Sequence, residues 1–164
     1  MATPASFDNP ELRRVLGTFA TGVTVISILD TQGNNRGMTV NSFSSVSLEP
    51  PLILWCLAFN TPDFRAFRDA GYFAVNILAE GQVAISERLA SLDQDKFTGI
   101  DFTPGLANVP LINGCAAVLE CRREAVYPGG DHVIILGRVE RLHHSGLPSL
   151  VFYASRYRTV GQAL

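Results

Sequence analysis

The chain has 164 residues, of which 47% are apolar and 17% charged, and its formal net charge is −2 at pH 7. This length suits one globular domain with its own core, and the lack of excess basic charge disfavours nucleic-acid binding. No apolar run approaches the roughly 18 residues of a membrane span, and residues 1–8 lack the pattern of a signal peptide. We therefore expect a single cytoplasmic domain over residues 1–164, with a flexible N-terminus at residues 1–8. Its lightly charged surface favours a homodimer that buries apolar area.

The first third of the chain predicts a helix followed by a β-hairpin. Asn9-Pro10 is typical of a helix start, and apolar residues at helical spacing extend that helix over residues 10–19. Residues 23–28 are rich in β-branched side chains and predict a strand. A turn-forming run separates them from a second strand at residues 37–43.

The middle of the chain alternates between short strands and helices. An apolar strand is expected over residues 52–59, and a helix that starts at Thr61-Pro62 with Phe64 and Phe67 facing inward. A strand at residues 72–78 and a helix at 83–92 follow. The Gly and Pro residues between 93 and 110 predict an ordered loop.

The second half is rich in strands. Residues 116–126 and 132–142 flank a Pro-Gly-Gly turn, which predicts a long β-hairpin. Many strands joined by hairpins, with few helices, indicate a mainly β fold with an antiparallel barrel rather than a doubly wound sheet. Neither a GxGxxG nor a GxxxxGK[ST] motif is present, so a nucleotide-like ligand would be held in another way.

The segment from residue 39 to residue 47 is dense in small polar side chains between two apolar stretches. These are Thr39, Asn41, Ser42, Ser44, Ser45 and Ser47. Such side chains can bind a polar ligand through many short hydrogen bonds without adding a charge. The alternative is an edge strand and turn whose hydroxyl groups bond locally or face water.

Two further groups of residues could bind a ligand. His132 follows Asp131 at a strand start, where the carboxylate could orient the imidazole toward a carbonyl or a phosphate; the alternative is a turn-closing Asp beside a half-exposed His. Thr61 could cap a helix whose free N–H groups, with Arg65, would hold an anion, although ordinary capping with an exposed Arg fits equally.

Some aromatic, histidine and cysteine side chains are weaker candidates for a functional role. Phe97 and Tyr157 could stack on a flat ring or belong to the core. The adjacent histidines 143 and 144 lack nearby Cys or carboxylate partners in the sequence and are expected at the surface. The three cysteines, an odd number without a CxxC motif, indicate buried thiols in a reducing compartment rather than a disulfide framework.

Several stretches, in this order and spacing, resemble the flavin reductase-like family, and within it the small reductase components of two-component flavin-dependent monooxygenases. They are FATGVTVIS (19–27), GMTVNSFSSVSLEPPLILWCL (37–57), FAVNIL (73–78), DKF (95–97), AVLEC (117–121), GDHVIILGRV (130–139) and FYASRYRTVG (152–161). The resemblance implies an FMN-binding split β-barrel of antiparallel Greek-key type, working as a homodimer with a flavin near the subunit interface. It also implies hydride transfer from NADH or NADPH to FMN or FAD, which supplies reduced flavin to a separate monooxygenase.

The resemblance also assigns roles to residues of this chain. The group expected to line the isoalloxazine ring and ribityl chain is Thr39, Asn41, Ser42, Ser45, Val46 and Ser47. The group expected to reach toward the phosphate end is Cys56, Phe59, Asn60 and Arg65. Phe97 and Tyr157 are the candidate stacking rings, and Asp131 and His132 would lie by the nicotinamide or the flavin edge, as the catalytic pair.

One departure and two alternatives accompany this assignment. Many relatives have a more Ser/Thr-rich segment at residues 60–63, where Asp63 places a negative charge near the expected phosphate. The first alternative is a flavin-binding electron-transfer or sensor module with little NAD(P)H turnover. The second is a structural or protein-interaction barrel that binds no flavin.

Overall fold

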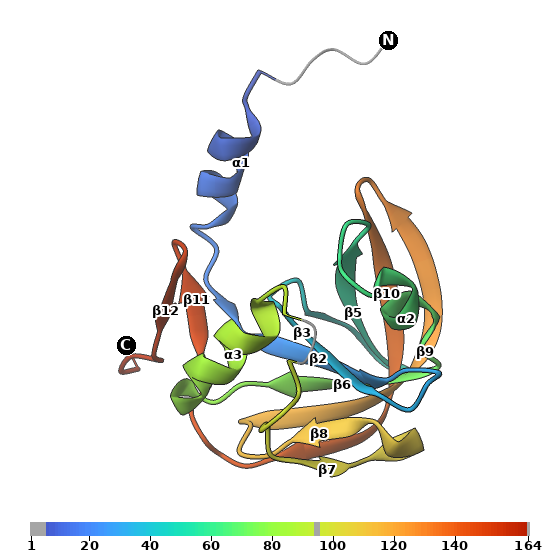
Figure 1. The fold of residues 1–164 in the computed structure, drawn as a ribbon. Helices are drawn as coiled ribbons and strands as arrows, with labels where there is room; N and C mark the ends of the chain where they lie inside the picture. The colour runs from blue at the N-terminus through green and yellow to red at the C-terminus, as the bar shows by residue number, and fades with distance from the viewer. Residues whose placement is uncertain (1–5, 94–95, 164) are drawn as a thin grey trace.

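The computed structural model describes residues 6–93 and 96–163, so Asp95 of the DKF stretch and most of the expected flexible N-terminus lie outside the described residues. The helices are α1 (Asn9–Leu16), α2 (Phe64–Asp69) and α3 (Val83–Ala90), with two short 3-10 helices, η1 (Glu80–Gln82) and η2 (Leu106–Asn108). The strands are β1 (Thr21–Gly22), β2 (Thr24–Leu29), β3 (Asn35–Val40), β4 (Ser44–Leu48), β5 (Pro51–Ala58), β6 (Tyr72–Ile77), β7 (Phe102–Pro104), β8 (Pro110–Ile112), β9 (Ala117–Gly129), β10 (His132–His144), β11 (Val151–Tyr153) and β12 (Arg156–Arg158). The predicted mainly β class is confirmed (Figure 1).

One large antiparallel sheet organises the chain. Its strand order is β3-β2-β6-β9-β10-β5-β4, flanked by a three-stranded sheet (β1-β11-β12) and the β7–β8 hairpin. The two edge strands of the large sheet, β3 and β4, are consecutive in the chain and joined only by residues 41–43. The sheet must therefore curl until its edges approach each other, although no ladder joins β3 to β4 among the described residues.

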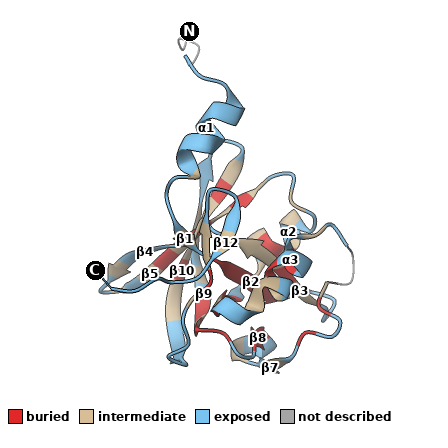
Figure 2. Ribbon diagram, turned by 90° about the vertical axis from the view of Figure 1, so that its left-hand side faces the viewer, coloured by how far each residue is buried: buried red, intermediate tan, exposed pale blue. Residues whose placement is uncertain are grey.

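The sheet contributes to two cores, one shared with α3 and the β7–β8 hairpin and the other shared with α2. The strand β2 is buried on both faces, so that Val25 packs into one core and Ile26 into the other. The strand β5 alternates, with Ile53, Trp55 and Leu57 inward, as period-2 patterning requires. Figure 2 shows buried residues gathered in the body of the sheet, whereas α1 has no buried residue and extends away from it.

The two predicted hairpins are confirmed: β2 pairs with β3, and β9 with β10.

The helix starts differ from the sequence predictions. Asp8, rather than Asn9, caps α1, because its carboxylate accepts the Glu11 N–H at 2.7 Å. The helix α2 begins only at Phe64, since Asp63 adopts a left-handed conformation (φ 60°) that an α-helix cannot contain. Thr61 is therefore not the helix cap.

The expected loop over residues 93–110 is partly structured. Phe102 pairs with Ile112 and Thr103 with Leu111 in the β7–β8 hairpin, which the Gly and Pro content of this segment concealed. Ala107 and Asn108 take positive φ values in the connecting turn. This hairpin covers β2 and β6, because the Ser27 hydroxyl donates to the Pro110 carbonyl and the Asn76 side chain accepts the Ile112 N–H at 2.8 Å.

Gly137 in β10 provides a test of this packing. A Cβ at this position would overlap the Phe73 ring and lie 3.3 Å from the Cys121 Cβ, two side chains of the core that contains Ile26. We expect Gly137→Ala to lower the free energy of unfolding by about 1–3 kcal/mol, because overpacking forces core side chains to shift. The measurement is urea unfolding followed by fluorescence of Trp55, the single tryptophan. The control is Gly71→Ala, where an added Cβ meets nothing within 4 Å; equal effects of the two substitutions would contradict this packing.

Candidate functional site

The gap between β3 and β4 contains the polar segment that the sequence singled out. Within it, the Ser42 hydroxyl accepts the Cys56 N–H at 3.0 Å and donates to the Cys56 carbonyl, which fastens the connection to β5. Asn41 and Ser45 are exposed and make no side-chain hydrogen bond within the described residues. The strand β4 is indeed an edge strand, as the alternative expectation held. Ser42 is bonded to the neighbouring strand, whereas the exposed side chains of Asn41 and Ser45 remain available to a ligand.

Asp131 and His132 lie beside the end of β5. His132 is opposite Ala58 in the β10–β5 ladder, and the Phe59 N–H donates to the Asp131 carbonyl at 3.1 Å. The two side chains contact each other, with His132 Nδ1 2.6 Å from Asp131 Oδ1. This hydrogen bond, followed by the charge of the imidazole, lowers the pKa of Asp131. The carboxylate thereby orients the half-exposed ring of His132, whose Nε2 has no partner in the described part of the chain.

Tyr157 meets the start of the polar segment in a cavity of about 200 Å³, whose lining includes Thr39, Asn41 and Ser86. The Tyr157 and Ser86 hydroxyl oxygens are 2.9 Å apart, and the Thr39 hydroxyl donates to the Ser86 carbonyl at 2.7 Å. The Tyr157 ring also packs edge-on against Phe152. The structure therefore brings Tyr157 to Thr39 and Asn41, with Ser86, which the sequence did not single out, as the link.

A neighbouring cavity of about 170 Å³ shares Asn41 and is also lined by Thr21. The Thr21 hydroxyl oxygen is buried and has no hydrogen-bond partner among the described residues. An orphaned buried hydroxyl costs free energy unless a ligand, a water molecule or another chain satisfies it. The unpartnered Thr21 hydroxyl is therefore an indication of a binding site at this gap that does not depend on the Ser-rich segment.

The remaining candidates lie elsewhere. Phe97 is buried, packs edge-on against Phe102, and lines a large cavity, of about 410 Å³, near the start of β3. Val46 and Ser47 lie within the edge strand β4, and Asn60 follows the end of β5. Arg65 is exposed on α2 and does not line the large cavity. The sequence predicted an anion site at the start of α2, with Thr61 as the helix cap. The Thr61 part of this prediction is wrong, because the capping residue is Asp63, whose carboxylate makes no capping hydrogen bond.

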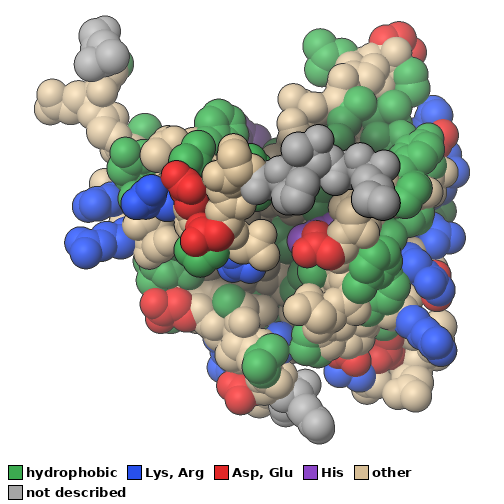
Figure 3. Space-filling view, turned by 90° about the horizontal axis from the view of Figure 1, so that it is seen from above, with side chains coloured by type: hydrophobic (Ala, Val, Ile, Leu, Met, Phe, Trp, Pro, Cys, Tyr) green, Lys and Arg blue, Asp and Glu red, His purple; other side chains and the backbone are tan. Residues whose placement is uncertain are grey.

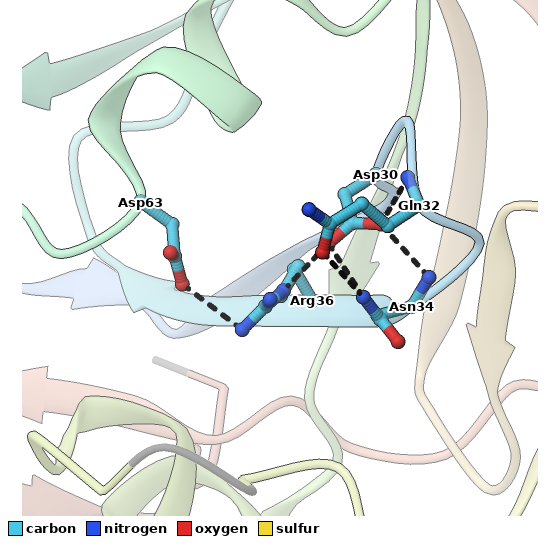
Figure 4. Close-up of polar contacts among 5 residues, drawn as sticks. All are labelled: Asp30, Gln32, Asn34, Arg36 and Asp63. Atoms are coloured by element: carbon cyan, nitrogen blue, oxygen red, sulfur yellow. Dashed lines mark hydrogen bonds and ion pairs between the residues drawn. The ribbon is translucent and has the colours of Figure 1, made fainter.

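A cation near this cavity comes instead from Arg36, which lines it. Figure 4 shows Arg36 between Asp30 and Asp63. Its Nε donates to Asp30 at 3.0 Å and its Nη1 to Asp63 at 3.3 Å. Burial raises the pKa of Asp30, but hydrogen bonds outweigh this effect and lower it to about 2. The bonds, in decreasing order of effect, come from the Asn34 N–H, Arg36, the Asn34 side-chain amide and the Gln32 N–H.

Other reactive groups are tied up in the fold. Burial raises the pKa of the Cys115 and Cys121 thiols to about 12, so neither is a ready thiolate. The expectation that His143 lacks a carboxylate partner is wrong, because its Nε2 is 2.9 Å from the buried Glu120 carboxylate. The described residues hold no group of three or more His, Cys, Asp or Glu side chains suited to a metal. Within the same residues, no helix is long and apolar enough to cross a membrane.

Comparison with known proteins gives a consistent result. Residues 16–161 match the family model described as a flavin reductase like domain. The reductase subunit HsaB of a flavin-dependent monooxygenase from Rhodococcus jostii is 40% identical over 93% of this chain and 78% of its own length. A probable flavin reductase of Rhizobium meliloti is 41% identical over 96% of this chain, which spans half of that relative's length. The NADH:FAD oxidoreductase SgcE6 of Streptomyces globisporus, solved in complex with NAD and FAD fragments, superposes with a TM-score of 0.88 at 37% identity, covering 96% of this chain and 98% of the other.

The Asp30 cluster predicts a specific acid sensitivity. Because the folded-state pKa of about 2 lies below the ordinary 3.8, this group stabilises the fold above about pH 4 and loses that effect as pH falls toward 2. We expect Asp30→Asn to lower the melting temperature at pH 6 and to flatten its fall between pH 4 and pH 2. Thermal unfolding across this range provides the measurement. Asp101→Asn is the control, since the exposed Asp101 carboxylate makes no hydrogen bond in the described chain; an identical profile for both variants would refute the role of Asp30.

Proposed function

The chain belongs to the flavin reductase-like family, and from this premise we propose that it transfers a hydride from NADH or NADPH to FMN or FAD and supplies reduced flavin to a separate monooxygenase. The observation that carries the proposal is the exposed polar segment after β3, which Ser42 fastens to β5, the strand whose end pairs with His132. The relatives support it, since one is a reductase subunit of a flavin-dependent monooxygenase and another an NADH:FAD oxidoreductase.

The residues at the gap fit a flavin. Asn41 and Ser45 offer neutral donors and acceptors, and the orphaned Thr21 hydroxyl lies in an adjoining cavity. A flavin ring has a polar edge and an apolar edge, so uncharged hydrogen-bonding groups beside apolar strands suit it. When bound, the flavin would supply the hydride-accepting chemistry, and the protein would supply binding, alignment and electrostatic tuning.

The roles of the chain's own groups follow from their chemistry. Neutral hydroxyl, amide and backbone N–H donors along residues 41–47 would stabilise negative charge that develops on the flavin during reduction. Asp131 holds Nδ1 of His132 and leaves Nε2 available to a polar group of the nicotinamide nucleotide. Ser42 would position the segment through its bonds to Cys56 rather than act on the ligand. Ring stacking by Tyr157 completes the proposed assignment, whereas Phe97 is buried against Phe102 and lines a separate cavity.

The proposal also covers the domain, the barrel type, the oligomeric state and the location of the protein. We propose one flavin reductase-like domain over residues 1–164, a split β-barrel of Greek-key type that forms a homodimer in the cytoplasm. The curled sheet with consecutive edge strands supports the barrel. The dimer is supported by α1, whose apolar face is uncovered: Val15, Leu16 and the following Phe19 are between 59% and 77% exposed. Figure 3 shows hydrophobic side chains broadly exposed between charged ones on the face at this end of the molecule.

Turnover with free flavin tests the proposed reaction. We expect the purified protein to oxidise NADH or NADPH at a rate that rises and saturates with added FMN, FAD or riboflavin, because the flavin is the hydride acceptor. The assay follows nicotinamide absorbance for each donor–acceptor pair. Flavin binding without turnover for any pair would replace this proposal with the electron-transfer or sensor module.

His132 provides a second test. We expect His132→Ala to raise KM for the nicotinamide nucleotide about tenfold, as the loss of one hydrogen bond from a charged or polar group implies, with a smaller effect on flavin affinity. Asp131→Asn should give a weaker change in the same direction, because it loosens the orientation of the ring. His144→Ala, at the far end of the same strand, is the control. Unchanged steady-state kinetics in His132→Ala would remove the residue from the site.

A further inference from the structure

We propose that Ser86 is a positioning residue of the reductase, which holds the Tyr157 ring and the Thr39 side chain in place beside the polar segment through one hydrogen bond each. The inference rests on the proposed function and deepens it. It assigns a role to the helix α3, which the proposed reaction does not otherwise use.

Ser86 lies where three separate parts of the chain meet. It belongs to α3, and its side chain is fully buried. Its hydroxyl oxygen is 2.9 Å from the hydroxyl oxygen of Tyr157 in β12, and its carbonyl accepts the hydroxyl of Thr39 in β3 at 2.7 Å. Figure 1 shows α3 between β12 and the large sheet that contains β3. One residue therefore ties the C-terminal strand and the start of the polar segment to the same helix.

The hydrogen bond to Tyr157, rather than the helix, explains why a serine occupies this position. Inside a helix, alanine is more favourable than serine, and a buried hydroxyl without a partner costs further free energy. The bond between the Ser86 and Tyr157 hydroxyl groups offsets both costs. Removal of either hydroxyl would leave the other without this partner, so the two groups act as a unit.

The Tyr157 side chain is held at two points. Phe152 packs edge-on against its ring, with the ring centroids 5.5 Å apart, and Ser86 holds its hydroxyl group. A packed ring and a bonded tip together define the orientation of the ring plane. The same ring lines the cavity of about 200 Å³ that Asn41 also lines. A flavin ring beside Asn41 would therefore meet a tyrosine that is already oriented, which lowers the entropic cost of binding.

Thr39 is fixed by the same residue. Its hydroxyl proton is donated to the Ser86 carbonyl, so Thr39 can offer a ligand only the lone pairs of its oxygen. Asn41, two residues further along, makes no side-chain hydrogen bond in the described part of the chain and supplies the amide group of this cavity. Ser86 therefore sets two of the side chains that line the cavity and leaves Asn41 free to bind.

Removal of either hydroxyl tests the positioning role. Riboflavin is the probe, because it carries the flavin ring without a phosphate, and its dissociation constant is measured by fluorescence titration. We expect Ser86→Ala and Tyr157→Phe each to weaken riboflavin binding about fivefold, as the loss of one net hydrogen bond implies. The double variant should bind no more weakly than either single variant, because both substitutions remove the same bond. An additive loss of about 25-fold, or no loss in either single variant, would overturn the proposal.

A spectroscopic readout separates positioning from stability. An aromatic ring stacked on a flavin quenches its fluorescence, so the residual fluorescence of riboflavin at saturation should rise in Ser86→Ala and in Tyr157→Phe. The control is Ser27→Ala, because Ser27 is also a fully buried serine, bonded to the Pro110 carbonyl, but lies outside this cavity. This control should lower the melting temperature and leave the residual fluorescence unchanged. An equal rise in Ser27→Ala, or no rise in Ser86→Ala, would contradict the positioning role.

Turnover by the unsubstituted protein separates this proposal from the proposed function. NAD(P)H oxidation with riboflavin as acceptor, together with unchanged riboflavin binding in Ser86→Ala, would uphold the reductase activity and refute only the role of Ser86. Absence of turnover with every flavin, together with the expected loss of riboflavin affinity, would refute the activity and uphold Ser86 as a positioning residue of a flavin-binding site.

Discussion

The consecutive edge strands of the large sheet are the constraint on which the site depends. Because β3 and β4 lie at opposite edges of a seven-stranded sheet and are joined by residues 41–43 alone, the sheet has to curl and leave a gap where its edges approach. Polar side chains are required there, since strand edges left without a ladder need other hydrogen-bond partners. Ser42 satisfies part of this requirement through Cys56, and its neighbours Asn41 and Ser45 remain open to a ligand.

The two ends of the proposed site differ in charge, and the difference matches the two ends of a flavin nucleotide. Hydroxyl and amide groups dominate at the gap, where a ring would be held without a fixed charge that favours one redox state strongly. Arg36, Lys96 and two carboxylates line the large cavity near the start of β3.

Local patterns predicted much of the fold, and long-range contacts account for what they missed. The apolar side chains of β5 alternate along the strand, and each of the two hairpins has characteristic turn residues. These patterns span only a few residues, so the elements were predictable. The start of α2 depends on the left-handed conformation of Asp63, which no pattern reveals. In the site, the dense Ser/Thr segment and the Asp131–His132 pair were visible in the sequence. Arg36 was hidden in a polar turn, and the Glu120–His143 contact joins residues 23 positions apart.

A crystal structure of the protein with FMN tests the central claim most directly, because it locates both ends of the ligand at once. We predict the isoalloxazine ring against residues 41–47. A ring bound away from the gap between β3 and β4 would contradict this account of the site.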